Sequence, residues 1–167
     1  MPRLAARPLR PSRLVVTLTL LAAASSLPAC DAALTVRNAA PRVTWVVVQP
    51  PAAEEPAHLT VWVSDLDGDP VDLALTVRGA DGADVALTLA PGGHGVIGLA
   101  TREGLGDPNG QPHLVLWDTT QAPAGPLVLT ITPTDAQGDA GATVATPPFT
   151  LDAGLPDPVT PAPLASP

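Results

Sequence analysis

The stretch LTVWVSDLDGDPVDLALTV, residues 59–77, decides the fold of this chain. Leu59, Val61 and Val63 alternate with more polar residues, and the same period of two returns over residues 71–77. Strict alternation places every second side chain on one face, which is typical of a β-strand with one buried side. Asp, Gly and Pro between the two runs are turn-forming residues. The stretch therefore predicts two strands joined by a tight turn.

Similar apolar runs extend outward on both sides of this stretch and are separated by Gly, Pro and Asp. Outside the N-terminal region, no segment of ten or more residues keeps a helical period without Pro or Gly. Period-two runs with turn residues about every ten positions predict an all-β protein, a single immunoglobulin-like β-sandwich of seven or eight strands over residues 41–151. The other expected strands are 43–49, 85–89 with Val85, Leu87 and Leu89 inward, 96–100, 113–117, 127–132 and 142–151.

The first thirty residues have the layout of an export signal. Residues 1–13 contain four Arg and no acid, an apolar run covers 14–24, and small residues follow. Such a run is too short to span a bilayer, which needs about 20 residues, so a secretory signal is expected. Leu27, Pro28, Ala29 and Cys30 resemble the bacterial lipobox. The alternatives are a plain secretory signal that is cleaved after Ala24 or Ala29, and a Cys30 that is a buried structural residue.

The lipobox resemblance implies a lipoprotein signal peptide over 1–29 and lipid on Cys30, the only Cys of the chain. Acyl chains anchor a protein to a membrane because each buried CH₂ contributes about 0.8 kcal/mol. Residues 30–40 would then form a short tether to the folded part. The expected location is the bacterial cell envelope, with the membrane leaflet left open.

Charge and proline separate the rest of the chain into an acidic body and a distinct end. Residues 30–167 hold 4 Arg, no Lys and 16 acidic residues, a net charge of −12. Such a chain has nothing to neutralise phosphates with, so no nucleic-acid partner is expected. Residues 152–167 contain five Pro in sixteen residues. Because Pro removes a backbone donor, we expect an extended, disordered tail there.

Three segments together resemble a bacterial extracellular immunoglobulin/fibronectin-III-like module. They are VWVSDLDGDPVDLALTV (61–77), GQPHLVLWDTT (110–120) and LVLTITPTDAQGDAGATVATPPFTLD (127–152). The resemblance implies the sandwich fold, and members of this family mostly lack an assigned activity. Its pattern places His113, Val115 and Trp117 on one face, so Trp117 is expected in the core, although simple alternation also allows Leu114 and Leu116 to point inward.

Two acidic turns offer candidate ligands for Ca²⁺. Asp65, Asp67 and Asp69 occupy alternate positions before residue 70, and Asp135 and Asp139 flank a second turn. Ca²⁺ takes six to eight oxygen ligands. If the strands before these turns are the second and sixth of the sandwich, both turns fall at the same end and the five carboxylates converge. The match to an EF-hand loop fails, and ordinary solvated turns are the competing interpretation.

Catalytic residues are scarce in this sequence. After residue 30 the chain has only Ser64 and Ser166 as serines and no Lys. His58, His94 and His113 are widely separated and lack metal-ligand spacing. No catalytic residue is assigned, and we expect a protein that is not an enzyme.

Trp62 is the candidate partner contact, because its face of the strand also carries His58, Thr60 and Ser64. An exposed Trp can anchor a partner, or it can pack under the long loop 90–111. The sequence thus predicts a lipid-anchored, non-enzymatic binding, adhesion or scaffold module whose partner is an unidentified protein or surface polymer. A Ca²⁺-stabilised adhesion module is the alternative, and an envelope hydrolase is the third hypothesis.

Overall fold

A computed structural model describes residues 38–52, 55–101 and 109–164. Residues Val36–Pro167 cluster as one compact unit, and every buried core residue of the described chain belongs to it. A unit with its own core has what it needs to fold alone. The expected signal peptide, Cys30 and most of the expected tether lie outside the described residues. Within the described ranges, no helix has the length and apolarity required to cross a bilayer.

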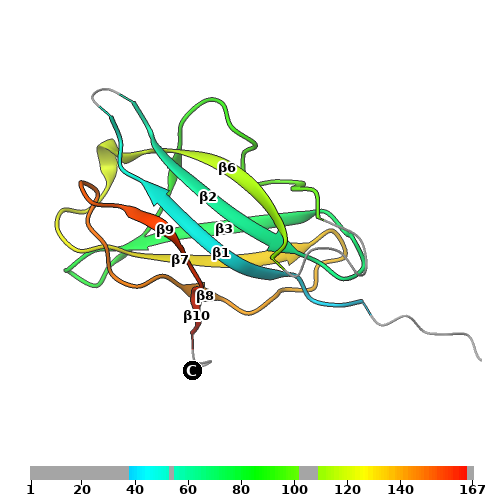
Figure 1. The fold of residues 1–167 in the computed structure, drawn as a ribbon. Helices are drawn as coiled ribbons and strands as arrows, with labels where there is room; N and C mark the ends of the chain where they lie inside the picture. Colours follow the sequence, from blue (N-terminus) through cyan, green and yellow to red (C-terminus); the bar gives the residue numbers. More distant parts are fainter. Residues whose placement is uncertain (1–37, 53–54, 102–108, 165–167) are drawn as a thin grey trace, which may run out of the picture. The chain divides into compact units, whose positions relative to one another are not determined.

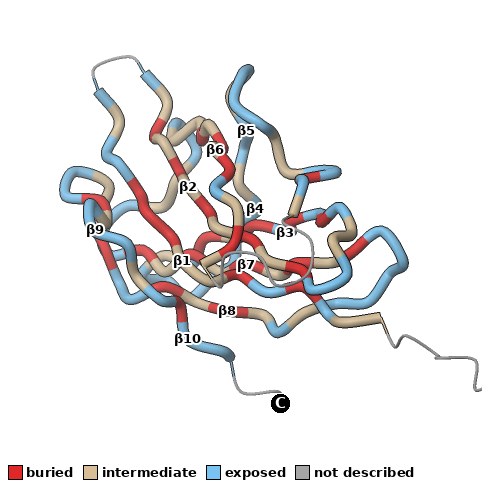
Figure 2. Tube along the Cα trace, turned by 45° about the vertical axis from the view of Figure 1, so that its right-hand side comes forward, coloured by how far each residue is buried: buried red, intermediate tan, exposed pale blue. Residues whose placement is uncertain are grey.

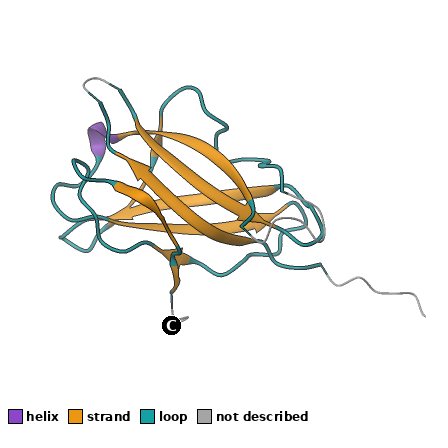
Figure 3. Cartoon of the chain, viewed as in Figure 1, coloured by secondary structure: helices purple, strands orange, loops and turns teal. Residues whose placement is uncertain are grey.

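Two antiparallel sheets, which we call sheet A and sheet B, build this unit (Figures 1 and 3). Sheet A has the order β5-β6-β2-β1-β9, and sheet B has the order β10-β8-β7-β3-β4. Sheet A comprises β1 (Arg42–Gln49), β2 (Ala57–Ser64), β5 (Thr88–Leu89), β6 (Gln111–Asp118) and β9 (Leu155–Val159). Sheet B comprises β3 (Val71–Arg78), β4 (Asp84–Ala86), β7 (Val128–Asp135), β8 (Val144–Ala145) and β10 (Ala162–Pro163).

The predicted all-β, immunoglobulin-like sandwich is confirmed. One 3₁₀ turn, η1 (Thr119–Gln121), is the only helical element in the described ranges. These ranges hold ten strands against the seven or eight expected, because several additional strands are only two or three residues long. Short strands complete the edges of the two sheets and contribute little to the core.

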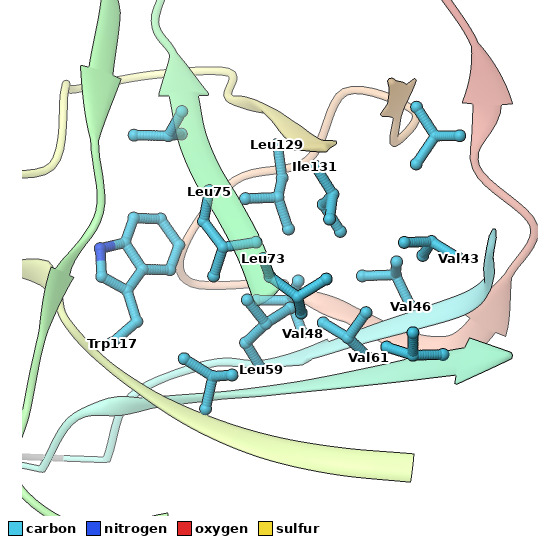
Figure 4. Close-up of a cluster of buried hydrophobic side chains, with 14 of the residues drawn as sticks. Val43, Val46, Val48, Leu59, Val61, Leu73, Leu75, Trp117, Leu129 and Ile131 are labelled. Atoms are coloured by element: carbon cyan, nitrogen blue, oxygen red, sulfur yellow. The ribbon is translucent and has the colours of Figure 1, made fainter. Parts of the chain in front are cut away.

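The core lies between the sheets and follows the alternation read from the sequence (Figure 2). Along β2, the side chains of Leu59, Val61 and Val63 are fully buried, and β3 shows the same alternation. Trp117 on β6 is 2 % exposed and lies among Leu59 and Leu75 in Figure 4. The predicted inward orientation of Trp117 is therefore confirmed. The bulky ring fills the space between the sheets better than Leu114 or Leu116 would.

Three expected strands are wrong in detail. Residues 84–86 pair with β3 in sheet B, whereas Thr88 and Leu89 pair with β6 in sheet A. The chain changes sheets between these strands, so Leu87 packs on the core while Val85 and Leu89 are exposed. Residues 96–100 form a loop joined to β3 by the isolated bridge Val71–Leu99. The predicted strand over 142–151 shrinks to β8.

The expected disordered tail is also wrong over the described residues 152–164. β9 pairs antiparallel with β1, and β10 pairs antiparallel with β8. Leu155 and Val159 pack against the core while Pro156 and Pro158 alternate with them and are exposed. Proline is tolerated on an edge strand because the missing N–H faces no neighbour. The sandwich therefore extends past residue 151.

Candidate functional site

The two acidic turns lie at the same end of the sandwich, as the sequence predicted. The turn after β2 and the turn after β7 are joined by the Gln137 side chain, whose Nε2 donates to Asp69 Oδ2 at 2.7 Å. Each turn is also held by its own first carboxylate. Asp65 Oδ1 accepts from the Asp67 amide at 2.8 Å, and Asp135 Oδ1 accepts from the amides of Gln137 and Asp139, both at 2.9 Å.

Asp135 is held in its ionised form by these donors. Its side chain is buried, which by itself would raise the pKa of the carboxyl group. Hydrogen bonds from the Asp139 amide, the Asn38 side chain and the Gln137 amide outweigh burial and lower the pKa. Donors to a carboxylate favour its charged form. The negative charge of the turn therefore persists down to acidic pH.

The segment that precedes β1 closes the acidic end. Asn38 Nδ2 donates to Asp135 Oδ2 at 2.5 Å and to Asp139 Oδ2 at 2.9 Å. The Ala39 amide donates to Asp67 Oδ2 at 2.5 Å. Neutral amide groups thus bridge carboxylates of both turns. Sequence reasoning missed Asn38 because the residue fell in the expected tether, where no local pattern distinguishes it.

The carboxylates do not gather around one point. Among the described residues, no three His, Cys, Asp or Glu side chains lie close enough together to hold a metal ion. Asn38, Asp67, Asp69 and Gln137 line a polar hollow of about 330 Å³. Two buried oxygens, Asn38 Oδ1 and Asp65 Oδ2, have no hydrogen-bond partner within the described part of the chain. Calcium binding at the five aspartates is an untested alternative to ordinary turns.

The outer face of sheet A carries two of the three tryptophans, Trp45 and Trp62. Trp45 and Trp62 are cross-strand partners on β1 and β2, and their ring centroids lie 6.2 Å apart at an interplanar angle of 70°. Edge-to-face contact is a favourable arrangement for two aromatic rings. Cross-strand pairs share a face, so the same surface continues onto β6. We call it the tryptophan face, formed by Trp45, Val47, His58, Thr60, Trp62, Leu114 and Leu116.

The tryptophan face contains no Asp, Glu, Arg or Lys, and except for Val47 its side chains are half-buried. The outer face of sheet B has a different character. β3 presents Asp72 and Arg78 there, and β7 presents Thr130, Thr132 and Thr134. The middle of the outer face of sheet A is thus aromatic and uncharged, whereas Arg42 on β1 and Asp118 on β6 lie at its ends.

A loop over residues 90–101 closes the side of the sandwich next to β6. The His94 amide donates to Leu114 O at 2.7 Å, and the Leu114 amide donates to His94 Nδ1 at 3.2 Å. His113, which is buried, donates from Nε2 to Ala100 O at 2.7 Å. The two imidazole rings are in edge contact, with centroids 5.4 Å apart. These histidines, which are remote in sequence, are brought together because the loop folds back over β6.

Burial is the largest influence on His113 and lowers its pKa from the ordinary value of 6.5. The hydrogen bond to Ala100 O acts in the opposite direction, and the nearby His94 lowers the pKa further. His113 is therefore neutral at pH 7. No pattern around residues 94 and 113 in the sequence indicated this contact.

The residues considered for hydrolysis are not brought together. Ser64 and His58 lie at opposite ends of β2, six residues apart, which is about 20 Å at the rise of a strand. A hollow of about 430 Å³ beside η1 contains Glu55 and Asp118. Asp118 accepts from the Thr120 amide at 3.0 Å, a bond that lowers the pKa of Asp118 and caps the turn. These positions provide no nucleophile–base pair.

Comparisons with protein-family models, with curated proteins and with solved structures find no significant match to this chain.

Proposed function

We propose that this protein is a lipid-anchored, non-enzymatic binding module of the bacterial cell envelope. The observation that carries the proposal is the contrast between the two outer faces of the sandwich. The middle of the outer face of sheet A is aromatic and free of charge on an acidic domain, and such a surface is suited to a partner that itself presents an uncharged surface. The lipobox resemblance at Cys30 supports the anchored location.

Contact through the tryptophan face is favoured over contact through the sheet edges. Strand addition requires an edge with free N–H and C=O groups. In sheet A, one edge is β9 with Pro156 and Pro158, and at the other edge β6 is paired with the two-residue strand β5 and bonded to the loop 90–101. Proline and covering loops are the devices that block strand addition.

Site-specific photo-crosslinking in the producing cells tests the binding role. A photoreactive residue at Thr60, inside the tryptophan face, is expected to yield a defined crosslinked partner. The matched control is Thr130, which faces outward at the centre of sheet B. Crosslinks from Thr60 should disappear when Trp62→Ala is added. Equal products at Thr60 and Thr130, or products that survive Trp62→Ala, would contradict the proposal.

Anchoring is tested separately, because a binding module could be exported without lipid. Labelling with radioactive palmitate should mark the wild-type chain and spare Cys30→Ser. The Cys30→Ser protein should also leave the membrane fraction. Label on neither protein would contradict the lipid anchor, and label on both would show that the lipid is not on Cys30; either result would leave the binding proposal standing.

A further inference from the structure

We propose that the partner of the tryptophan face is a second copy of this chain, bound face to face about a twofold axis. The inference rests on the proposed function, because it names the partner of the surface proposed there. Its basis is the charge at the two ends of the outer face of sheet A. An exposed arginine lies at one end, and a hollow with two carboxylates lies at the other. A surface of this kind is complementary to itself.

Arg42 supplies the positive end. It begins β1 and pairs with Ser64 of β2, which the period of two places on the side of sheet A that carries the tryptophan face. Arg42 is exposed. The ion pair between Arg78 and Asp84 is the only one in the described part of the chain, so Arg42 has no carboxylate partner there. Its guanidinium is therefore available to a carboxylate of another molecule.

The hollow of about 430 Å³ beside η1 supplies the negative end (Figure 3). Asp118 and Glu55 line it together with proline, alanine and threonine side chains. The hydrogen bond from the Thr120 amide lowers the pKa of Asp118, so this carboxylate is ionised at neutral pH. A guanidinium forms strong, charge-assisted hydrogen bonds with carboxylates, and its aliphatic stem packs on apolar groups. The hollow thus suits an arginine side chain.

The strand register separates the two ends along a diagonal of the sheet. Arg42 is level with Ser64 of β2, and the pairing of β2 with β6 places Asp118 level with residue 56. These levels are about 27 Å apart at about 3.4 Å per residue, and Thr60 lies midway. Across the sheet, β1 and β6 flank β2 and are about 10 Å apart.

A single twofold axis satisfies both ends at once. An axis that lies in the plane of contact over Thr60, at right angles to the diagonal, brings Arg42 of each copy onto Asp118 of the other. The same rotation turns the strands of the two copies by about 40° relative to each other, from the spacings of the sheet. Sheets that pack face to face with aligned strands cross at about 30°. The charges and the packing of the sheets therefore favour one orientation.

This orientation brings uncharged side chains together in the middle of the contact. Trp62 of one copy lies against Leu116 of the second copy, and Trp45 lies against His58 of the second copy. Thr60 lies on the axis and meets its own equivalent. Aromatic groups at the centre and charged pairs at the rim are the usual anatomy of a protein interface. No Asp, Glu, Arg or Lys of the tryptophan face is buried without a partner, because that face contains none.

The contact is small, so the dimer is weak and reversible. The three central strands cover about 14 Å by about 27 Å, or about 400 Å² in each copy. Stable complexes bury about 800 Å² on each partner. The net negative charge of the chain also opposes association of two copies. On the proposed function, anchoring confines the copies to one membrane and raises their effective concentration.

Sedimentation equilibrium of the unit 36–167, from about 10 μM to about 1 mM, tests the dimer. The mass of the wild type should rise toward twice that of the monomer and stop there, because a twofold contact is closed. Thr60→Asp places two like charges on the axis and should weaken association at least about tenfold. Thr130→Asp is the matched control at the centre of sheet B, and it should associate as the wild type does.

Exchange of the end charges tests the orientation. Arg42→Asp alone and Asp118→Arg alone should each weaken association, because like charges then meet at both ends. A mixture of these two variants should associate one to one, since every pair at the ends is then opposite in sign. Asp81→Arg, in the turn between β3 and β4, has the same net charge as Asp118→Arg. Its mixture with Arg42→Asp is the control and should not recover association.

Three results in solution would overturn the proposal, provided that circular dichroism shows folded variants. One is a wild type that stays monomeric up to about 1 mM. A second is an equal effect of Thr60→Asp and Thr130→Asp. The third is a mixture of Arg42→Asp and Asp118→Arg that associates no better than the control mixture with Asp81→Arg.

Photo-crosslinking of the full chain in cells separates this inference from the proposed function. The photoreactive residue at Thr60 should give a product that contains two copies of the chain. A defined product with a different protein would remove the second copy as partner and leave the binding role standing. The absence of any defined product would contradict both.

Discussion

Replacement of Trp117 by Ala is the sharpest test of the core. The indole is 2 % exposed and lies beside Leu75 on β3 and Leu59 on β2 at one end of the core (Figure 4). Burial of about 200 Å² at about 25 cal/mol per Å² corresponds to about 5 kcal/mol. Truncations of buried Trp to Ala cost about 3–5 kcal/mol. We therefore expect Trp117→Ala to lower the free energy of unfolding by about 4 kcal/mol.

Trp62→Ala is the matched control, because it removes the same side chain from the other face of sheet A. Trp62 is half-buried and contacts Trp45, a pair worth about 0.5–1.5 kcal/mol beyond its burial. Trp62→Ala should therefore lower the free energy of unfolding by about 1–2 kcal/mol. In a domain of this size, about 4 kcal/mol corresponds to a fall in Tm of about 12–20 °C.

Urea unfolding of the unit 36–167, followed by circular dichroism, measures both variants. The m-values should match that of the wild type, since the folded surface changes little. Equal losses for Trp117→Ala and Trp62→Ala, or a larger loss for Trp62→Ala, would refute the assignment of Trp117 to the core and Trp62 to the outer face.

Three further predictions concern the backbone, the acidic end and the C-terminal strands. Gly141→Ala should lower the free energy of unfolding by about 3 kcal/mol or more, because the added Cβ would collide with the Pro41 carbonyl oxygen. Gly125 has a positive φ, but no atom lies within 4 Å of the Cβ that Ala would add, so Gly125→Ala should lower the free energy of unfolding by about 1 kcal/mol. Similar losses for Gly141→Ala and Gly125→Ala in urea unfolding would contradict this distinction. The Tm values in EDTA and in millimolar Ca²⁺ should coincide, because amide groups bridge the carboxylates. A calcium site filled at 100 Kd would raise the free energy of unfolding by about 2.7 kcal/mol. A rise in Tm of several degrees that is abolished by Asp67→Ala would therefore contradict this expectation and establish the calcium site. Removal of residues 154–167 should lower Tm and cause concentration-dependent association through the uncovered edge of β1, measurable by light scattering. A truncated protein that stays monomeric would argue against this role of β9.

The central strands could be predicted from sequence because one physical signal dominates them. Leu59, Val61 and Val63 each bury an apolar side chain on the same face, and the period of two is unambiguous. Trp117 could be placed because its volume decides which face of β6 is buried. The period of two gave a wrong prediction where neighbouring residues belong to different sheets: Val85 lies in sheet B and Leu89 in sheet A.

The contacts of the candidate site could not be predicted, because they join residues that are distant in sequence. Asn38 reaches Asp135 across 97 positions. His94 meets His113 only because a glycine-rich loop turns back over β6. The prolines in residues 155–159 argued against a strand in the sequence, yet an edge strand needs fewer main-chain donors than a central one and tolerates them. Local patterns contain none of this tertiary information.

The pairing of β1 with β9 has a consequence for the order of events after synthesis. β1 begins at Arg42 and β9 ends at Val159, so sheet A joins nearly the first and nearly the last residues of the described chain. At a synthesis rate of about 5–20 residues per second, roughly 110 residues separate the two strands by about 5–20 s. The hairpin of β1 and β2 can form early, but its outer edge stays open until the C-terminal segment arrives. A chain that is threaded through an export channel from its N-terminus would thus complete this sheet only after nearly all of it has crossed.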